Sequence, residues 1–102
     1  SVTKGLDDLN REEVGLYLLR RSGGELIYIG EGKIKDRVNA HIKKGRQVGH
    51  PQAFAFSEPA SIELSFIQRN DLAKHQLLEI ENDLIAAHFI QTGVIPSAQF
   101  LG

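Results

Sequence analysis

The stretch that decides the fold is Val14–Gly30, which reads VGLYLLRRSGGELIYIG. Two runs of apolar and aromatic residues, Val14–Arg20 and Leu26–Gly30, flank the tripeptide Ser22-Gly23-Gly24. Strand-forming runs separated by a glycine-rich turn are typical of a β-hairpin. We therefore predict two antiparallel strands joined by a tight turn.

The hairpin also predicts which side chains share a face of the sheet. With an even-numbered turn centred on Ser22-Gly23, Tyr17 lies directly opposite Tyr28, because side chains alternate along each strand. The two tyrosines then share one face, where they form either a packing pair or part of a site. The other face carries only apolar side chains and is predicted to be the core: Leu16, Leu18, Ile27 and Ile29.

The rest of the chain predicts two helices and a third strand. Ile34–Lys44 has an apolar residue at every fourth position, as in a helix with one buried stripe. Ile62–Ile67 alternates like a strand, and Asp71 can cap a long helix that ends near Gln91. The order β-β-α-β-α predicts an α+β fold with a small antiparallel three-stranded sheet flanked by helices.

Length and composition indicate a single globular domain. The chain has 102 residues with 41% hydrophobic and 25% charged residues. Residues 1–13 are expected to form a polar lead-in and residues 14–102 the domain. No apolar run approaches the roughly 18 residues of a membrane span, so no membrane partner is expected. Cysteine is absent, which excludes a disulfide scaffold, a zinc finger and a thiol nucleophile. A cytoplasmic or nucleoid-associated location is expected.

Positive charge is concentrated in one part of the chain. Residues 31–50 hold six cations and two anions, a net charge of +4, whereas the remainder holds six cations and eleven anions, a net charge of −5. This stretch is either a solvated helix face or a patch that contacts phosphates. If it is a patch, its nucleic-acid contacts are Lys33, Lys35, Lys43, Lys44 and Arg46.

The long helix places a carboxylate among apolar residues. On a helical wheel that starts at Leu72, Glu81 falls at about 180°, near the middle of the apolar arc, and Glu79 falls at about 340°, on the polar side. A carboxylate on an apolar face is usually paired or binds a metal. Glu81 is therefore either a partner of Arg37 in a buried ion pair or a ligand of a hard divalent cation.

The first helix carries an arginine and a histidine on the same edge. Arg37 and His41 are four residues apart, so they are neighbours beside the apolar stripe. Arginine presents a fork of donors that matches phosphate, and histidine can orient a phenol or a water molecule. The pair is either an ordinary surface pair or part of a phosphate site.

Together these features resemble the GIY-YIG nuclease superfamily. Gly15-Leu16-Tyr17, ten intervening residues and Tyr28-Ile29-Gly30 are similar to its two signature elements. Arg37 follows Gly30 by seven residues, and His41 follows four residues later. Glu81 stands three residues before Leu84-Ile85, as in the metal-binding helix of that family. The resemblance spans about residues 14–99.

The resemblance implies a metal-dependent endonuclease domain that hydrolyses phosphodiester bonds in DNA, or in RNA. Tyr17 would act as general base or position the water, Tyr28 would support that network, and His41 would orient Tyr17 or share the proton transfer. Arg37 would bind the scissile phosphate, and Glu81 would hold one Mg²⁺ or Mn²⁺ ion. The implied catalytic set is completed by Gln99, in Pro96-Ser97-Ala98-Gln99, where the family has Asn; an exposed tail residue is the alternative.

Other functions remain open at this stage. The alternatives are a catalytically weakened nucleic-acid-binding module and a protein-interaction module of the same fold. The formal net charge of −1 is low for a nuclease. DNA affinity is therefore expected from the +4 stretch alone or with an additional DNA-binding domain, a partner protein or a second copy. Repair, restriction, mobile-element and toxin roles all fit the sequence.

Overall fold

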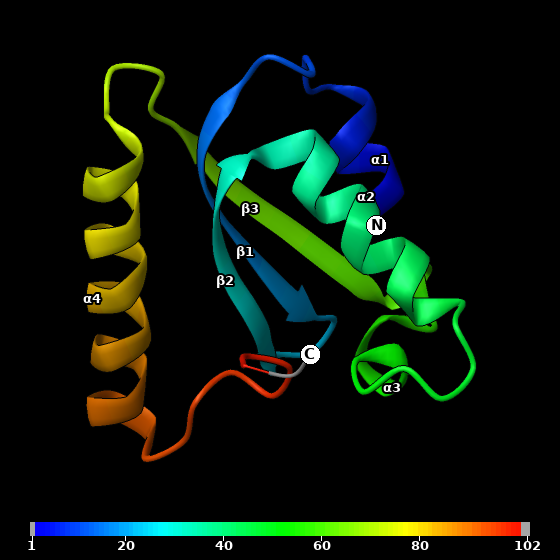
Figure 1. The fold of residues 1–102 in the computed structure, drawn as a ribbon. Helices are drawn as coiled ribbons and strands as arrows, with labels where there is room; N and C mark the ends of the chain where they lie inside the picture. The colour runs from blue at the N-terminus through cyan, green and yellow to red at the C-terminus, as the bar shows by residue number, and fades with distance from the viewer. Residues whose placement is uncertain (1, 101–102) are drawn as a thin grey trace.

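Three antiparallel strands form the centre of the molecule. The computed structural model describes residues 2–100, apart from the Thr3 side chain; Ser1 of the expected lead-in and Leu101 and Gly102 of the expected domain lie outside the described residues. Strands β1 (Val14–Arg21), β2 (Leu26–Lys33) and β3 (Ile62–Gln68) pair in the order β2-β1-β3. The α+β class and the three-stranded antiparallel sheet are confirmed (Figure 1).

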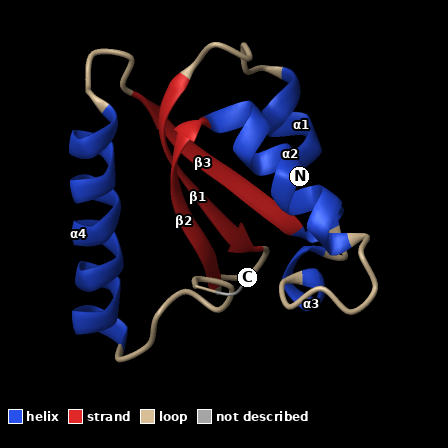
Figure 2. Ribbon diagram, in the orientation of Figure 1, coloured by secondary structure: helices blue, strands red, loops and turns tan. Residues whose placement is uncertain are grey.

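Helices cover both faces of this sheet. The chain runs through α1 (Val2–Asp7), β1, β2, α2 (Ile34–Gly45), α3 (Ala53–Phe56), a 3-10 turn η1 (Pro59–Ser61), β3 and α4 (Lys74–Thr92). Figure 2 shows α1, α2 and α3 on one side of the sheet and α4 on the other. The predicted order β-β-α-β-α was wrong because it lacked α1, α3 and η1. Elements of three to six residues are too short to show a helical period in the sequence.

The larger core lies under α1, α2 and α3. It contains Tyr17, which is fully buried, and it extends into the expected lead-in through Val2, Leu6 and Leu9. A smaller cluster of Leu26, Ile29 and Ile85 lies under α4, with Leu18 against it. The prediction that the face opposite the tyrosines is the core was therefore incomplete, since helices bury both faces. Burial of consecutive residues in β1 and β2 leaves no alternation along these strands that could have shown this.

The hairpin register differs from the predicted one by two residues. Leu19, not Tyr17, pairs with Tyr28, and Tyr17 pairs with Gly30. The reason is a longer turn: the Arg21 N–H donates to the Glu25 C=O, and the register shifts beside Leu19 and Arg20. The two-residue shift keeps both tyrosines on one face, as predicted, but the irregularity moves Ile27 into the larger core.

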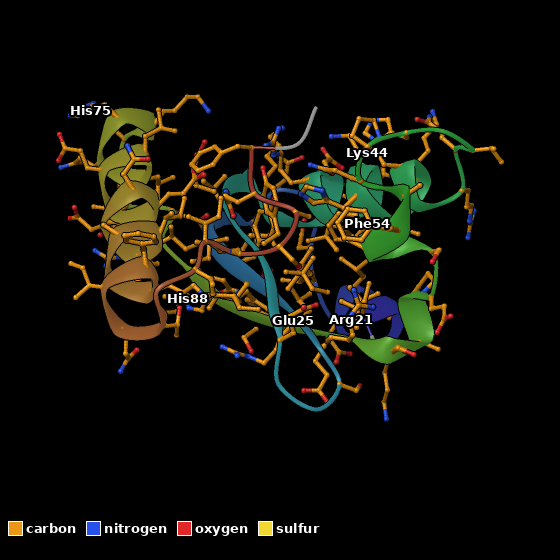
Figure 3. All side chains as sticks on the ribbon, turned by 90° about the horizontal axis from the view of Figure 1, so that it is seen from below. Arg21, Glu25, Lys44, Phe54, His75 and His88 are labelled. Atoms are coloured by element: carbon orange, nitrogen blue, oxygen red, sulfur yellow. The ribbon has the colours of Figure 1, made fainter. Side chains whose placement is uncertain are left out.

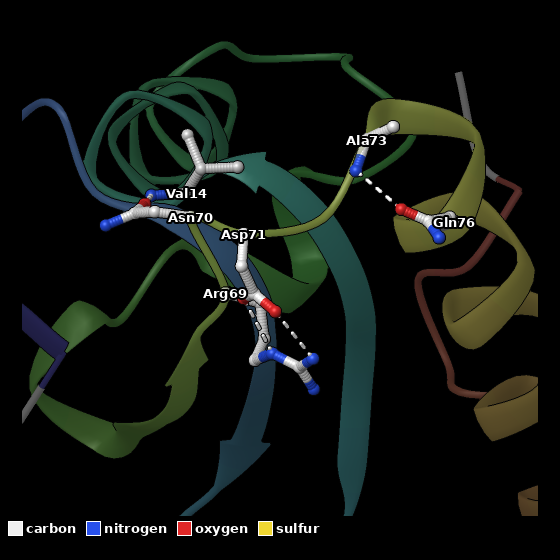
Figure 4. Close-up of polar contacts among 6 residues, drawn as sticks. All are labelled: Val14, Arg69, Asn70, Asp71, Ala73 and Gln76. Atoms are coloured by element: carbon white, nitrogen blue, oxygen red, sulfur yellow. Dashed lines mark hydrogen bonds and ion pairs between the residues drawn. The ribbon is translucent and has the colours of Figure 1, made fainter.

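The long helix begins later than predicted. The N-cap of α4 is Ala73, whose N–H donates to the Gln76 side chain at 2.8 Å. The predicted cap, Asp71, instead forms two hydrogen bonds of 3.0 Å with the Arg69 guanidinium in the preceding loop (Figure 4). The predicted end is confirmed, because Gly93 follows the helix with φ of 79°, the left-handed conformation typical of a helix C-cap.

Residues after α4 return to the outer edge of β2. The N–H groups of Ser97 and Ala98 donate to the C=O groups of Leu26 and Ile27 at 3.2 and 2.9 Å. The described helices, within residues 2–100, include none that is long and apolar enough to cross a membrane.

Candidate functional site

The two motif glycines are required by close packing. A Cβ at Gly15 would collide with the backbone of Ile67 on β3, and a Cβ at Gly30 would collide with the ring of Tyr17. The Tyr17 ring therefore lies across β2 at its cross-strand partner, where only glycine leaves room. The glycine opposite Tyr17 thus determines where the phenol of Tyr17 lies.

A chain of buried polar groups starts at this phenol. The Tyr17 hydroxyl is 3.0 Å from His41 Nε2, and His41 Nδ1 is 3.3 Å from Gln52 Oε1. The Gln52 amide nitrogen donates in turn to the Ala98 C=O at 3.2 Å. His41 and Gln52 are 3% and 2% exposed, so these bonds are shielded from water. Three elements, β1, α2 and the segment before α3, thus meet at one buried relay.

The amide of Gln52 determines the direction of this relay. Because its nitrogen donates to Ala98, its oxygen faces His41 and requires a hydrogen on Nδ1. A neutral His41 then has an unprotonated Nε2, which accepts the hydrogen of the Tyr17 hydroxyl. The arrangement is suited to moving a proton from the phenol toward the imidazole. The sequence offered no signal for Gln52, which lies in a mostly polar, proline-containing loop.

Aromatic rings hold the imidazole in place. Its centroid lies 4.3 Å from that of Tyr28 and 4.9 Å from that of Phe56. The Tyr28 ring is also stacked with the ring of Tyr17, with centroids 6.2 Å apart. The two tyrosines and His41 therefore form one cluster, as expected from their shared face and from the position of His41 on α2.

Burial holds the tyrosines in their neutral form. Burial raises the pKa of Tyr17 well above its ordinary value of 10, and the pKa of Tyr28 is also raised, again chiefly by burial. The Arg37 guanidinium opposes both shifts through its charge and hydrogen bonding. Arg37 is exposed to solvent, so it can lower these pKa values and still meet an anionic ligand.

The histidine is also held neutral. Burial is the main cause that lowers the pKa of His41 to about 4; the Gln52 hydrogen bond opposes the shift, and the charges of Lys44 and Arg37 add to it. At neutral pH the imidazole is therefore an acceptor for Tyr17.

The stability of the folded chain is expected to fall as the pH drops from 6.5 to about 4. In that window the unfolded chain takes up a proton on His41 that the folded chain excludes, so acid favours unfolding. The pKa difference corresponds to on the order of 3 kcal/mol. Urea unfolding across this pH range measures the effect. In the variant His41→Gln this part of the pH dependence should disappear, and an unchanged slope would contradict the assignment.

Glu81 lies on the side of α4 that packs against the sheet. Its neighbours one turn away in each direction, Leu77 and Ile85, are buried, and Glu81 itself is half-buried. Burial raises the pKa of Glu81, the charge of Glu31 raises it further, and the charges of Arg37 and Lys74 oppose these effects. The four ion pairs among the described residues do not join Glu81 to Arg37. Glu79 is exposed, as the helical wheel predicts.

The apolar arc of α4 is only partly buried. Leu78, Leu84 and Phe89 are 40%, 37% and 52% exposed, because the helix contacts the sheet along a narrow stripe. The buried stripe of α4 is therefore narrower than the apolar arc on the helical wheel. Glu81 belongs to the narrow stripe that does face the sheet.

Gln99 has a backbone role on β2. Its amide oxygen accepts from the Ile29 N–H, and its amide nitrogen donates to the Ile29 C=O, each at 2.9 Å. Gln99 is 4% exposed, so it is not an exposed tail residue. It supports the strand that carries Tyr28 and Gly30.

The five basic residues predicted to contact nucleic acid fall into two groups. Lys33 faces Glu12 at 3.9 Å, and the Lys35 ammonium donates to the Leu9 C=O at 3.3 Å, so these two contact the N-terminal segment. The other three, Lys43, Lys44 and Arg46, lie at the C-terminal end of α2 and just beyond it. Lys43 and Arg46 are exposed and Lys44 is half-buried, on the α2–α3 side of the molecule (Figure 3).

The tyrosine cluster and Glu81 lie on the two faces of the sheet beside the edge strand β2. Helix α2 packs on one face and α4 on the other (Figure 2). The charges of Arg37 and Glu81 influence each other, and Glu81 also raises the pKa of both tyrosines. Tyr17, Tyr28, His41 and Arg37 are thus neighbours, and Glu81 is coupled to them through its charge, with no hydrogen bond or ion pair to them among the described residues.

A separate pocket of about 430 Å³ lies elsewhere on the molecule. His88 and Thr92 of α4 and Ser97 of the C-terminal segment line it, together with the start of β2. Figure 3 shows His88 on the side of α4 that faces the sheet. The pocket contains none of the residues expected in the site.

Comparison with known proteins leaves the relationship to a family open. No family model and no curated protein matches the chain.

Proposed function

We propose that the chain is a metal-dependent endonuclease domain of GIY-YIG type that hydrolyses phosphodiester bonds in DNA. The observation that carries the proposal is the directed relay Tyr17–His41–Gln52 beside the exposed Arg37. Such a relay handles a proton, and an exposed guanidinium next to it binds an anion. Phosphodiester hydrolysis needs both functions at one place.

Tyr17 works in this proposal as a proton relay. Because the pKa of Tyr17 is raised, almost no phenolate is present near neutral pH. The proposed mechanism therefore uses the neutral phenol and not a tyrosinate base. Tyr17 is fully buried in the free chain, so the attacking water would have to enter beside Arg37, the exposed neighbour of the phenol. As this water attacks the phosphorus, the bond to the leaving oxygen breaks, a water proton passes to the phenolic oxygen, and the phenolic proton passes to His41 Nε2. The Gln52 oxygen then stabilises the imidazolium through the Nδ1 hydrogen.

The substrate itself would prepare the histidine. The positive charges of Arg37 and Lys44 contribute to the low pKa of His41. A phosphate bound at Arg37 offsets this positive charge, which raises the pKa of His41 and makes the imidazole a better proton acceptor. Tyr28 keeps the imidazole in position by packing against it with tilted rings. Arg37 stabilises the charge that develops on the phosphate oxygens.

The carboxylate on α4 fits a hard divalent cation. Among residues 2–100 there is no group of three or more His, Cys, Asp or Glu side chains that could hold a metal. Mg²⁺ needs only one or two carboxylates when water and phosphate oxygens complete its shell. Glu81, half-buried at the edge where Arg37 lies, would hold it. A bound Mg²⁺ or Mn²⁺ ion would supply positive charge to the phosphate and the leaving oxygen.

DNA would approach over the C-terminal end of α2. Lys43, Lys44 and Arg46 supply phosphate contacts there, with further affinity from an additional domain, a partner protein or a second copy. The proposed location is the cytoplasm or the nucleoid, and repair or restriction are the proposed roles.

A plasmid-nicking assay tests the proposed function. The wild-type chain should nick plasmid with Mg²⁺ and should not with EDTA. Tyr17→Phe keeps the buried ring and removes the relay hydroxyl, so cleavage should fall about 100-fold or more. If the folded chain cleaves neither DNA nor RNA with Mg²⁺ or Mn²⁺, the nuclease proposal is rejected. Salt-dependent DNA binding without cleavage would then favour a nucleic-acid-binding module.

A further inference from the structure

A second carboxylate, Glu31, lies directly after Gly30 on β2. It is only 6% exposed. Its Oε1 accepts a hydrogen bond of 3.0 Å from the Lys74 ammonium, but its Oε2 is buried and has no hydrogen-bond partner in the described part of the chain. A buried polar atom without a partner usually costs on the order of 1–3 kcal/mol, so its presence requires a reason.

Lys74 is a weak and replaceable partner for this group. It is the first residue of α4, and its side chain is 75% exposed. An exposed ammonium contributes little to an ion pair, because solvent screens it and the long side chain loses freedom. The lysine contacts one carboxylate oxygen and leaves the other, buried oxygen without a partner.

The strand places Glu31 on the face that α4 covers. Glu31 pairs with Leu16 and lies two residues after Ile29, so Glu31 and Ile29 point to the same side of β2. Ile29 packs in the cluster that contains Ile85 of α4. The unpartnered Oε2 atom of Glu31 therefore lies at the interface between β2 and α4, called the seam below.

Glu81 occupies the same seam from the helix side. Along α4, Lys74 contacts Glu31, and Ile85 packs with Ile29. Glu81 lies between these two positions, one turn before Ile85, and faces the sheet. The electrostatic influence of Glu31 on Glu81 agrees with this placement. Two carboxylates thus lie on the facing surfaces of β2 and α4.

We propose that Glu31 is a second carboxylate ligand of the divalent cation, shared with Glu81, and that the cation displaces the Lys74 ammonium. The inference rests on the metal dependence in the proposed function and deepens it. It explains why a buried oxygen lacks a donor: a cation, not a hydrogen bond, satisfies it. Two carboxylates and several waters are a common set for Mg²⁺ or Mn²⁺.

Mn²⁺ binding without nucleic acid tests this ligand set. Free Mn²⁺ is measured by electron paramagnetic resonance against a titration of wild-type protein and variants. Glu31→Gln and Glu81→Gln should each weaken binding at least about tenfold, because each removes an anionic ligand. Glu31→Asp keeps a carboxylate and should bind more tightly than Glu31→Gln. Lys74→Ala removes the competing ammonium and should bind Mn²⁺ more tightly than wild type.

Controls separate the loss of a ligand from the loss of the fold. Glu79→Gln alters an exposed carboxylate on the same helix and should bind Mn²⁺ as wild type does. Without metal, Glu31→Gln should melt at the wild-type temperature or above, since it removes a desolvated charge. Mn²⁺ at a concentration that saturates wild type should raise the melting temperature of wild type more than that of Glu31→Gln.

Two results would overturn the inference. If folded Glu31→Gln binds Mn²⁺ as tightly as wild type while Glu81→Gln does not, Glu31 is not a ligand, and the proposed nuclease still stands. If Lys74→Ala binds Mn²⁺ more weakly, the ammonium is not a competitor. Nicking by the wild-type chain is measured separately, so a failure of the proposed function is recognised independently.

Discussion

Alanine in place of Arg37 is expected to abolish detectable cleavage and to leave the fold intact. The guanidinium is exposed, and its methylene groups lie beside Gly32, so little packing is lost. Loss of a preorganised positive charge at a phosphoryl transition state costs about 10²–10³ in rate. Single-turnover nicking of a plasmid, with circular dichroism to check the fold, measures the effect.

Two further variants sharpen this experiment. Arg37→Lys keeps the charge but loses the planar fork of donors, so it should recover only part of the rate. Arg20→Ala alters an exposed arginine on β1 that bonds the Gly24 C=O, and it should cleave as wild type does. Nicking at the wild-type rate by folded Arg37→Ala would show that the phosphate is bound elsewhere.

Glu81→Gln is expected to lose cleavage that depends on Mg²⁺, whereas Glu79→Gln should cleave almost normally. The glutamine keeps the size of the side chain and removes the anionic oxygen, so the helix should persist. Glu81 faces the sheet and Glu79 faces solvent, and an exposed substitution usually changes stability by no more than about 0.5 kcal/mol. Paired nicking assays with Mg²⁺ titrations on both variants provide the measurement.

The melting temperature of Glu81→Gln without metal provides a second test of the role of Glu81. Because burial and the charge of Glu31 raise the pKa of Glu81, the ionised form is disfavoured in the folded chain. Replacing it with a neutral amide should therefore maintain or raise the melting temperature without metal. If Glu79→Gln is inactive and Glu81→Gln is active, the cation is held from the other side of α4.

Local sequence patterns predicted the elements that carry the site. The hairpin, α2 and β3 follow from turn residues and apolar periods, and the clustering of Tyr17, Tyr28 and His41 follows from the shared face. The pairing of Leu19 with Tyr28 could not be predicted, because the turn length depends on backbone hydrogen bonds that residue types do not encode. A register error of two residues leaves each side chain on the same face of the sheet. The predicted clustering of Tyr17 with Tyr28 was therefore unaffected.

The missed residues reach the site through long-range packing. Gln52 joins His41 only because α3 folds back against α2, and no local period marks a helix of four residues. In the sequence, Glu31 is one of two anions in the basic stretch of residues 31–50 and has no distinguishing pattern. Only the fold places it against α4. Asp71 is a residue type that commonly caps helices, but its carboxylate instead accepts two hydrogen bonds from the nearby Arg69.

The amide of Gln99 has a consequence for the behaviour of the chain in solution. An edge strand with unpaired N–H and C=O groups can recruit strands from other molecules and begin aggregation. Ser97 and Ala98 donate hydrogen bonds to the C=O groups of Leu26 and Ile27. The Gln99 side chain bonds both the N–H and the C=O of Ile29. The C-terminal segment thus seals the outer edge of β2 up to the residue before Gly30. The site stays open to a ligand, and the rest of the edge is protected from self-association.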